Sequence, residues 1–205
     1  YKGPMNQLNC SATLYTPADK EVPFANNDTL YCIGWLDLRT EPMVITVPAV
    51  EKARYRSVML TDMSSVNYGL IGTRTTGNGA GDFLIVGPDW QGATPKGIAG
   101  VYRSTTQFSS AITRTELKNK GDIEAVRNIQ SGFRVRTLSS YLGSASPTPA
   151  AAIQFPKISR ELAKANFFAY LDLVLGLTPV RAEDKDVRAR MASIEGHRRA
   201  ADART

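Results

Sequence analysis

Histidine and cysteine are scarce in this chain of 205 residues, and their scarcity excludes several kinds of chemistry. The one histidine, His197, lies in a polar C-terminal tail, so a serine or cysteine nucleophile would have no imidazole as its general base. The two cysteines, Cys10 and Cys32, are 22 residues apart and match no zinc-binding spacing. We therefore expect no metal site and no cofactor, although carboxylate-bound Ca²⁺ or Mg²⁺ stays allowed.

Long apolar runs and blocks of like charge are also absent. No apolar run approaches the ~18–20 residues needed to cross a bilayer, which predicts no membrane span. The net charge is +6, and residues 91–140 carry eight basic and three acidic side chains. This excess is diffuse and lacks the dense basic stripe with interleaved aromatics that is typical of nucleic-acid binding. We expect a solvated surface and no nucleic acid, with a site for anionic groups as the alternative.

The composition, 42% hydrophobic and 21% charged, is that of a folded globular protein with one domain, or one domain and a small appendage. Short aromatic and β-branched runs recur in the first 140 residues, with turn signals every ~10–15 residues. This pattern favours an antiparallel β-sandwich over a parallel sheet. The expected strands are residues 29–38, 43–47, 55–60, 83–86, 100–103 and 133–137.

Helical periodicity enters this β-rich part at residues 106–117 and 122–131, and it dominates the C-terminal part. We predict a β-sandwich domain over residues 1–140, a Ser-, Pro- and Ala-rich linker over 141–156, and a helical hairpin with a polar tail over 157–205. Apolar residues spaced by three and four predict one helix over 158–175, for which Gly176 suits the C-cap, and a shorter one over 184–194. The tail, residues 197–205, is expected to fray.

Cys10 and Cys32 leave two possibilities open. They could pair in an exported protein, or they could be two buried thiols. No signal peptide is visible after Tyr1, which fits either a cytoplasmic protein or an exported one whose signal peptide has been removed by cleavage. These residues alone leave the location open.

Two polar segments are candidates for ligand binding. Residues 73–82, TRTTGNGAGD, have the glycines of a turn before a strand but match neither the nucleotide P-loop nor the dinucleotide fingerprint. Residues 25–32, ANNDTLYC, read as a turn before another strand, since Asn and Asp bond to nearby backbone. As functional alternatives, Arg74 would contact an anion, and Asn27, Asp28 and Tyr31 would face a ligand.

Acidic side chains at predicted strand ends and turns, together with three arginines, suggest a reaction centre. Asp28 and Asp62 would serve as acid and base, as paired carboxylates do in glycoside hydrolases. Arg74, Arg103 and Arg114 would hold an anionic group, because the planar guanidinium binds a carboxylate through two hydrogen bonds. Asp82 is a further candidate for ligand binding. Sequence spacing alone does not say which of these side chains converge.

Two long segments carry a resemblance to a known family. NNDTLYCIGWLDLRTEPMVITVP (residues 26–48) and RTTGNGAGDFLIVGPDW (74–90) resemble the bacterial domain of unknown function 1254 family. The segment AVRNIQSGFRVRTLS (125–139) follows in the same order. The resemblance implies an immunoglobulin-like β-sandwich followed by a small helical domain. It also implies a second family domain, domain of unknown function 1214, as a partner. Many members are predicted to be exported, so the resemblance leads us to expect a periplasmic or secreted protein, while a cytoplasmic location stays open. Cys32 stands where members more often have a serine.

The resemblance carries no established activity, so two hypotheses for function remain. The first is a non-catalytic binding or structural module of a larger two-domain protein, which would bind a glycan, a small anion, the second family domain or another copy of itself. The second is a hydrolase or lyase that acts on an acidic or polyhydroxylated substrate through its Asp and Arg residues.

Overall fold

The computed structural model describes residues 3–16, 18–19 and 26–202, and it describes side chains up to residue 193. The chain divides into two compact units, Tyr1–Ser159 and Arg160–Thr205, which are taken separately below. The predicted linker, residues 141–156, falls within the first unit.

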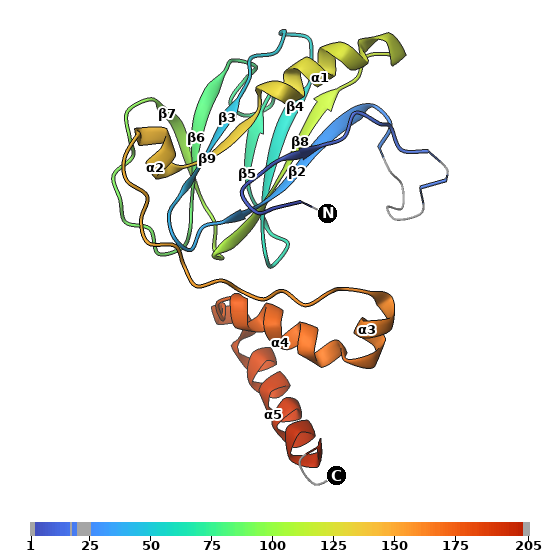
Figure 1. Ribbon diagram of the computed structural model, residues 1–205, viewed down its shortest axis with the longest axis vertical. Coiled ribbons are helices and arrows are strands. Elements are labelled where there is room, and N and C mark those ends of the chain that lie inside the picture. Colours follow the sequence, from blue (N-terminus) through green and yellow to red (C-terminus); the bar gives the residue numbers. More distant parts are fainter. Residues whose placement is uncertain (1–2, 17, 20–25, 203–205) are drawn as a thin grey trace. The chain divides into compact units, whose positions relative to one another are not determined.

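The first unit is built from two β-sheets (Figure 1). The five-stranded sheet, in the order β1-β2-β8-β4-β5, comprises β1 (Asn9–Cys10), β2 (Thr29–Asp37), β8 (Phe108–Glu116), β4 (Arg56–Asp62) and β5 (Asn67–Gly72). The four-stranded sheet, in the order β7-β6-β3-β9, comprises β7 (Ile98–Arg103), β6 (Gly81–Val86), β3 (Met43–Val47) and β9 (Arg134–Thr137). The fold is therefore mainly β, as predicted.

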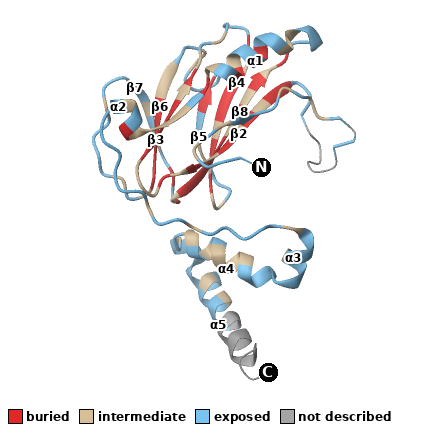
Figure 2. Cartoon of the chain, in the orientation of Figure 1, coloured by how far each residue is buried: buried red, intermediate tan, exposed pale blue. Residues whose placement is uncertain are grey.

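The main hydrophobic core draws its side chains from both sheets, as expected for a β-sandwich. Leu36, Val58 and Leu60 of the five-stranded sheet and Ile45 and Ile85 of the four-stranded sheet are all fully buried in one cluster. Figure 2 shows that the buried positions concentrate on the strands of this unit. The more specific prediction of an immunoglobulin-like arrangement stays a prediction.

The helix predicted over residues 106–117 is wrong, because this segment forms strand β8. β8 lies in the middle of its sheet and pairs antiparallel with β2 on one side and β4 on the other. Its threonines and Ile112 are β-branched, and such side chains pack well on a pleated surface. Pairing on both edges and burial of alternate residues outweigh the weak helical spacing of the apolar residues.

One strand pair departs from the predicted antiparallel arrangement. β6 pairs antiparallel with β3 but parallel with β7, with Leu84 opposite Val101. The glycine-rich segment before β6 forms the predicted turn, in which Gly77 has a φ of +81°. The other predicted strands match β2, β3, β4, β6, β7 and β9, whereas β1 and β5 were not predicted.

Three short helical segments complete the first unit. The helix predicted near residues 122–131 is confirmed as α1 (Ile123–Gly132), which follows the 3-10 turn η1 (Lys120–Asp122). Val126 of α1 is fully buried beside Leu30 and Leu117 in a second, smaller apolar cluster, which fixes this helix to the start of β2. Helix α2 (Leu138–Leu142) lies at the start of the predicted linker and ends at Gly143, whose φ is +64°.

The second unit contains α3 (Arg160–Ala165), α4 (Phe167–Leu177), the 3-10 turn η2 (Ala182–Asp184) and α5 (Lys185–Asp202). The single helix predicted over residues 158–175 is interrupted at Asn166, whose side chain accepts a hydrogen bond from the Ala169 amide and caps α4. Gly176 lies inside α4 and is not its cap. The predicted helix over 184–194 extends to Asp202, which contradicts the predicted fraying of 197–202; residues 203–205 lie outside the described residues.

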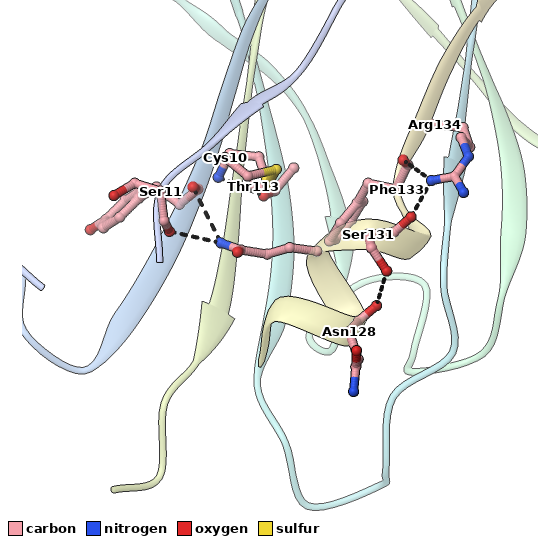
Figure 3. The surroundings of a disulfide bond; sticks show 10 residues. Cys10, Ser11, Thr113, Asn128, Ser131, Phe133 and Arg134 are labelled. Atoms are coloured by element: carbon pink, nitrogen blue, oxygen red, sulfur yellow. Dashed lines mark hydrogen bonds between the residues drawn. A yellow bond between two sulfur atoms is a disulfide. The ribbon is translucent and has the colours of Figure 1, made fainter. Parts of the chain in front are cut away.

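Cys10 and Cys32 form a disulfide that joins β1 to β2 and resolves the alternative between a pair and two thiols (Figure 3). The two residues are also opposite each other in the β1–β2 ladder. Behind this pair, Gln130 of α1 donates hydrogen bonds to the carbonyls of Ser11 (3.0 Å) and Tyr31 (3.3 Å). The disulfide and Gln130 together hold the backbone of Tyr31 and Cys32 beside that of Cys10 and Ser11.

Candidate anion-binding pocket

An open pocket of about 470 Å³ lies at the end of the five-stranded sheet where β2 begins and β8 ends. We call it the β2–β8 pocket. Tyr55, just before β4, and Arg74, in the glycine-rich turn, complete its wall. Its lining residues are Asn26, Asp28, Thr29, Tyr55, Arg74, Arg114, Glu116, Leu117 and Lys118.

Two arginines of this pocket lie over tyrosine rings. The Arg114 guanidinium carbon is 5.5 Å from the centre of the Tyr31 ring, its neighbour across the β2–β8 ladder. The Arg74 guanidinium carbon is 5.6 Å from the centre of the Tyr55 ring. Among the residues that the structure describes, neither arginine has an acidic partner within salt-bridge distance. Both cations are therefore held in place by aromatic contact while their N–H donors stay available to a ligand.

Buried polar atoms without partners accompany the two arginines. The Thr29 hydroxyl lines the pocket and, within the described part of the chain, has no hydrogen-bond partner, although only 6% of the residue is exposed. Two more buried polar atoms have no hydrogen-bond partner among the described residues: the Nε atom of Arg114 and the hydroxyl of Ser57. Ser57 is opposite Arg114 in the β4–β8 ladder. Buried polar groups usually have partners, so unpaired ones at a pocket indicate a place for water or a ligand.

Two carboxylates also line the pocket. Glu116 accepts a hydrogen bond from the Tyr55 amide at 2.8 Å, which fixes its position. Asp28 is exposed, and its amide bonds to the Asn26 side chain at 2.8 Å, as the predicted turn requires. Lys118 is neutralised by Glu51 at 3.0 Å. The pocket thus offers two free cations beside two acceptors that could bond to ligand hydroxyls.

A buried ion pair stiffens the framework behind the pocket. Arg54, 4% exposed, bonds to both carboxylate oxygens of Asp122 (2.6 and 2.9 Å), to Glu51, and to the carbonyl of Glu116. The hydrogen bonds from Arg54 lower the pKa of Asp122 from 3.8 to about 2. The same contacts, those to Asp122 first, raise the pKa of Arg54 above its ordinary value. Arg54 thereby ties β4, the end of β8 and the start of α1 together.

A second buried arginine holds the turn that carries Arg74. Arg56 is fully buried and donates to the carbonyls of Pro48, Gly77 (2.9 Å) and Gly79 (3.4 Å). No carboxylate faces it among the described residues, and burial lowers its pKa. Next to it, Gly72 has a φ of +144°, and a Cβ there would lie 2.1 Å from the Arg56 carbonyl oxygen. The turn is therefore fixed through its backbone.

The structure brings together some of the predicted site residues. Asp28, Arg74 and Arg114 line the β2–β8 pocket, and Tyr31 lies under Arg114. Asn27 lies in the same exposed turn but is not part of the pocket lining.

The other candidates lie elsewhere and have structural partners. Asp82 of β6 accepts from Thr46 and is 3.6 Å from Arg136. Arg103 donates to the carbonyls of Gly87 and Pro88, both at 3.0 Å. These two positions are bound within the four-stranded sheet and its turns, so neither belongs to the pocket.

Asp28 and Asp62 do not form the predicted acid–base pair. Thr29, beside Asp28, is opposite Glu116 at one end of β8, while Asp62 is opposite Ser109 at the other end. Seven residues of strand separate the two positions, or roughly 24 Å. Asp62 is buried and accepts from the amides of Ser64 and Val66 and from the Thr105 hydroxyl, so it holds a turn.

Six residues of the pocket lining were not predicted as site residues from the sequence: Asn26, Thr29, Tyr55, Glu116, Leu117 and Lys118. Once residues 108–116 are recognised as a strand, the pairing of β8 with β2 and β4 brings Tyr55 and Glu116 beside Asp28 and Arg114. The strand register was thus the missing information.

No group of three or more metal-binding side chains occurs among the described residues. None of the helices in the described part of the chain is both long and apolar enough to cross a membrane.

Comparison with known proteins decides the family. The family model described as "Protein of unknown function (DUF1254)" matches residues 5–137, which is more than half of the chain. The chain belongs to this family. The match covers every strand of both sheets and the whole β2–β8 pocket. No curated protein matches the chain.

Two solved structures are similar to this DUF1254 chain, and the first of them supports its fold. The VPA0106 protein from Vibrio parahaemolyticus matches with a TM-score of 0.65 and 24% identity, over 98% of this chain and 51% of that protein. The chain thus spans about half the length of VPA0106. An uncharacterized protein from Burkholderia cenocepacia matches with a TM-score of 0.36 and 14% identity, over 63% of this chain and 34% of that one.

Proposed function

We propose that this chain is a non-catalytic binding module that takes a small organic anion, a carboxylate or phosphate, into the β2–β8 pocket. The observation that carries the proposal is the pair Arg74 and Arg114. Each lies over a tyrosine ring, and neither has an acidic partner among the described side chains. A guanidinium already held on an aromatic face loses less freedom when it binds an anion, so more of the interaction energy appears as affinity.

The experiment measures the melting temperature of the chain against acetate, phosphate, glucuronate and an uncharged sugar. A ligand at a hundredfold over its dissociation constant stabilises the folded state by about 2.7 kcal/mol, or about 5–11 °C in a domain of this size. The anions should raise the melting temperature, and the neutral sugar alone should not.

Matched variants locate the effect. Arg114→Gln should abolish the shift, whereas Arg127→Gln removes the same charge from an exposed position of α1 and should keep it. Equal shifts in both variants would show a general salt effect and refute the pocket as the site.

An enzyme is the second candidate, because two carboxylates, Asp28 and Glu116, line the same pocket as the arginines. It would be a hydrolase or lyase acting on an acidic or polyhydroxylated substrate. The test is incubation with polygalacturonate, followed by assays for reducing and unsaturated sugar ends. Turnover that is lost in both Asp28→Asn and Glu116→Gln would favour the enzyme over the binding module.

We further infer that the chain works as one module of a larger, exported protein. Its coverage of about half of VPA0106 supports the first part. The Cys10–Cys32 disulfide supports export, since disulfides persist mainly in oxidising compartments. A second domain or another copy of the chain would be the partner. Fractionation of cells that produce the full-length protein would test the location.

A further inference from the structure

We propose that the anion in the β2–β8 pocket is the head of an amphiphile whose apolar chain lies along the outer face of the five-stranded sheet. This inference rests on the proposed function and adds the class of ligand to it. It comes from the strand register, which places an apolar row directly beside the Arg114 row.

The outer face is defined by alternation along the strands. On β2 the even-numbered residues from Leu30 to Leu36 are buried, while Tyr31, Ile33 and Trp35 are only half-buried and lie on the opposite face. Arg114 is opposite Tyr31 on one side and Ser57 on the other, so these three form one row across the sheet.

The next row on the same face is apolar across four strands. Ile33 of β2 is opposite Ile112 of β8, which is opposite Met59 of β4, which is opposite Leu70 of β5. None of the four belongs to a core cluster, and Leu70 is 37% exposed. Opposite side chains in a sheet have Cβ atoms about 5 Å apart, so the row is continuous. We call it the apolar row.

The apolar row and the arginine have the spacing of an amphiphile. The apolar row lies two residues along the strand from the row that contains Arg114, which is a distance of about 7 Å. An anion held by Arg114 can therefore extend an alkyl chain onto Ile112 without leaving the surface. On the side of the apolar row away from Arg114, the next row consists of Trp35, Ser110 and Thr61. The hydroxyls of Ser110 and Thr61 limit the apolar surface on that side.

The size of the apolar row favours a single alkyl chain over a protein partner. Stable protein interfaces use about 20–30 residues on each side. The apolar row has four side chains between polar rows, and its charged neighbour is a cation. An acidic head with an apolar tail satisfies both features at once.

The experiment is calorimetric titration of the chain with acetate, butyrate, hexanoate and octanoate below their micellar concentrations. A fully buried CH₂ contributes about 0.8 kcal/mol, which is about fourfold in affinity. A CH₂ that lies on the sheet face and is only half buried should increase the affinity about twofold. Octanoate should therefore bind at least tenfold more tightly than butyrate. Ile112→Thr keeps a β-branched residue in the strand and should remove most of this gain.

Val101→Thr is the matched control, because Val101 is an exposed valine (40%) on β7 of the other sheet. It should leave the dependence on chain length intact. Equal affinity for butyrate and octanoate would overturn the inference and leave the proposed function standing. Binding of neither acid would overturn both. Sedimentation that shows a dimer of the wild type and a monomer of Ile112→Thr would assign the row to a second copy of the chain and overturn the amphiphile.

Discussion

Removing the carboxylate of Asp122 should destabilise the first unit by an amount that depends on pH. The contacts from Arg54 lower the pKa of Asp122 from 3.8 to about 2. Each pKa unit corresponds to 1.36 kcal/mol, so the charged carboxylate stabilises the fold by about 2–3 kcal/mol. Asp122→Ala should cost this amount at pH 7, or about 4–12 °C in melting temperature.

The sign of the pH dependence follows from the lowered pKa. The stabilisation is complete above the unfolded pKa near 4 and is lost as the pH falls through the folded pKa near 2. About half of it should be gone by pH 3. The free-energy difference between wild type and Asp122→Ala should therefore shrink to about half between pH 7 and pH 3.

Urea unfolding followed by circular dichroism at both pH values measures this difference. Glu124→Ala is the control, because Glu124 pairs with Arg127 on an exposed helix surface, where ion pairs contribute about 0.5 kcal/mol or less. Equal losses in Asp122→Ala and Glu124→Ala at pH 7 would refute the reasoning. A deficit of Asp122→Ala that stays constant down to pH 3 would refute it too.

Two further predictions concern the disulfide and a buried phenol. Reduction of the Cys10–Cys32 disulfide should lower the free energy of unfolding by about 3 kcal/mol, because the unfolded chain loses the constraint of the closed loop. Thermal melting of the wild type with and without dithiothreitol measures this loss. The double variant Cys10→Ser/Cys32→Ser is the control, and its melting temperature should not respond to dithiothreitol. Burial raises the pKa of Tyr68 to about 12, so the neutral phenol stabilises the folded state below pH 10, and this contribution is lost as the pH rises toward 12. In Tyr68→Phe the free energy of unfolding should fall less steeply between pH 10 and pH 12. An unchanged slope in urea unfolding experiments over this range would contradict the prediction.

The sequence predicts strands well where the local pattern and the packing agree. β3 matches its expected range, Met43–Val47, because an apolar run between two prolines leaves little choice. The sequence-based prediction fails for β8, because its apolar residues fit the spacing of a helix as well as that of a strand. Its strand structure comes from pairing with β2 and β4. It also fails for β5, where Gly69 and Gly72 weaken the strand pattern and the pairing with β4 compensates.

The candidate site was predictable in the same partial way. Asp28, Arg74 and Arg114 could be proposed from residue type and from turns, and they do share one pocket. Asp62 could not be separated from them, because its residue type is the same as that of Asp28 and only the strand register places it at the other end of β8. Residue type indicates what a side chain can do, whereas register decides which side chains meet.

The contacts of Arg56 have a consequence for how the glycine-rich turn tolerates change. Arg56 bonds to the carbonyl oxygens of Gly77 and Gly79, and a carbonyl is present whatever the side chain. A Cβ at Gly79 would meet no atom within 4 Å and its φ is not positive, whereas the φ of +81° at Gly77 favours glycine. Position 79 can thus be randomised in a library while Arg56 and Gly77 stay constant, so the turn that carries Arg74 can accept new side chains without losing its backbone contacts to Arg56.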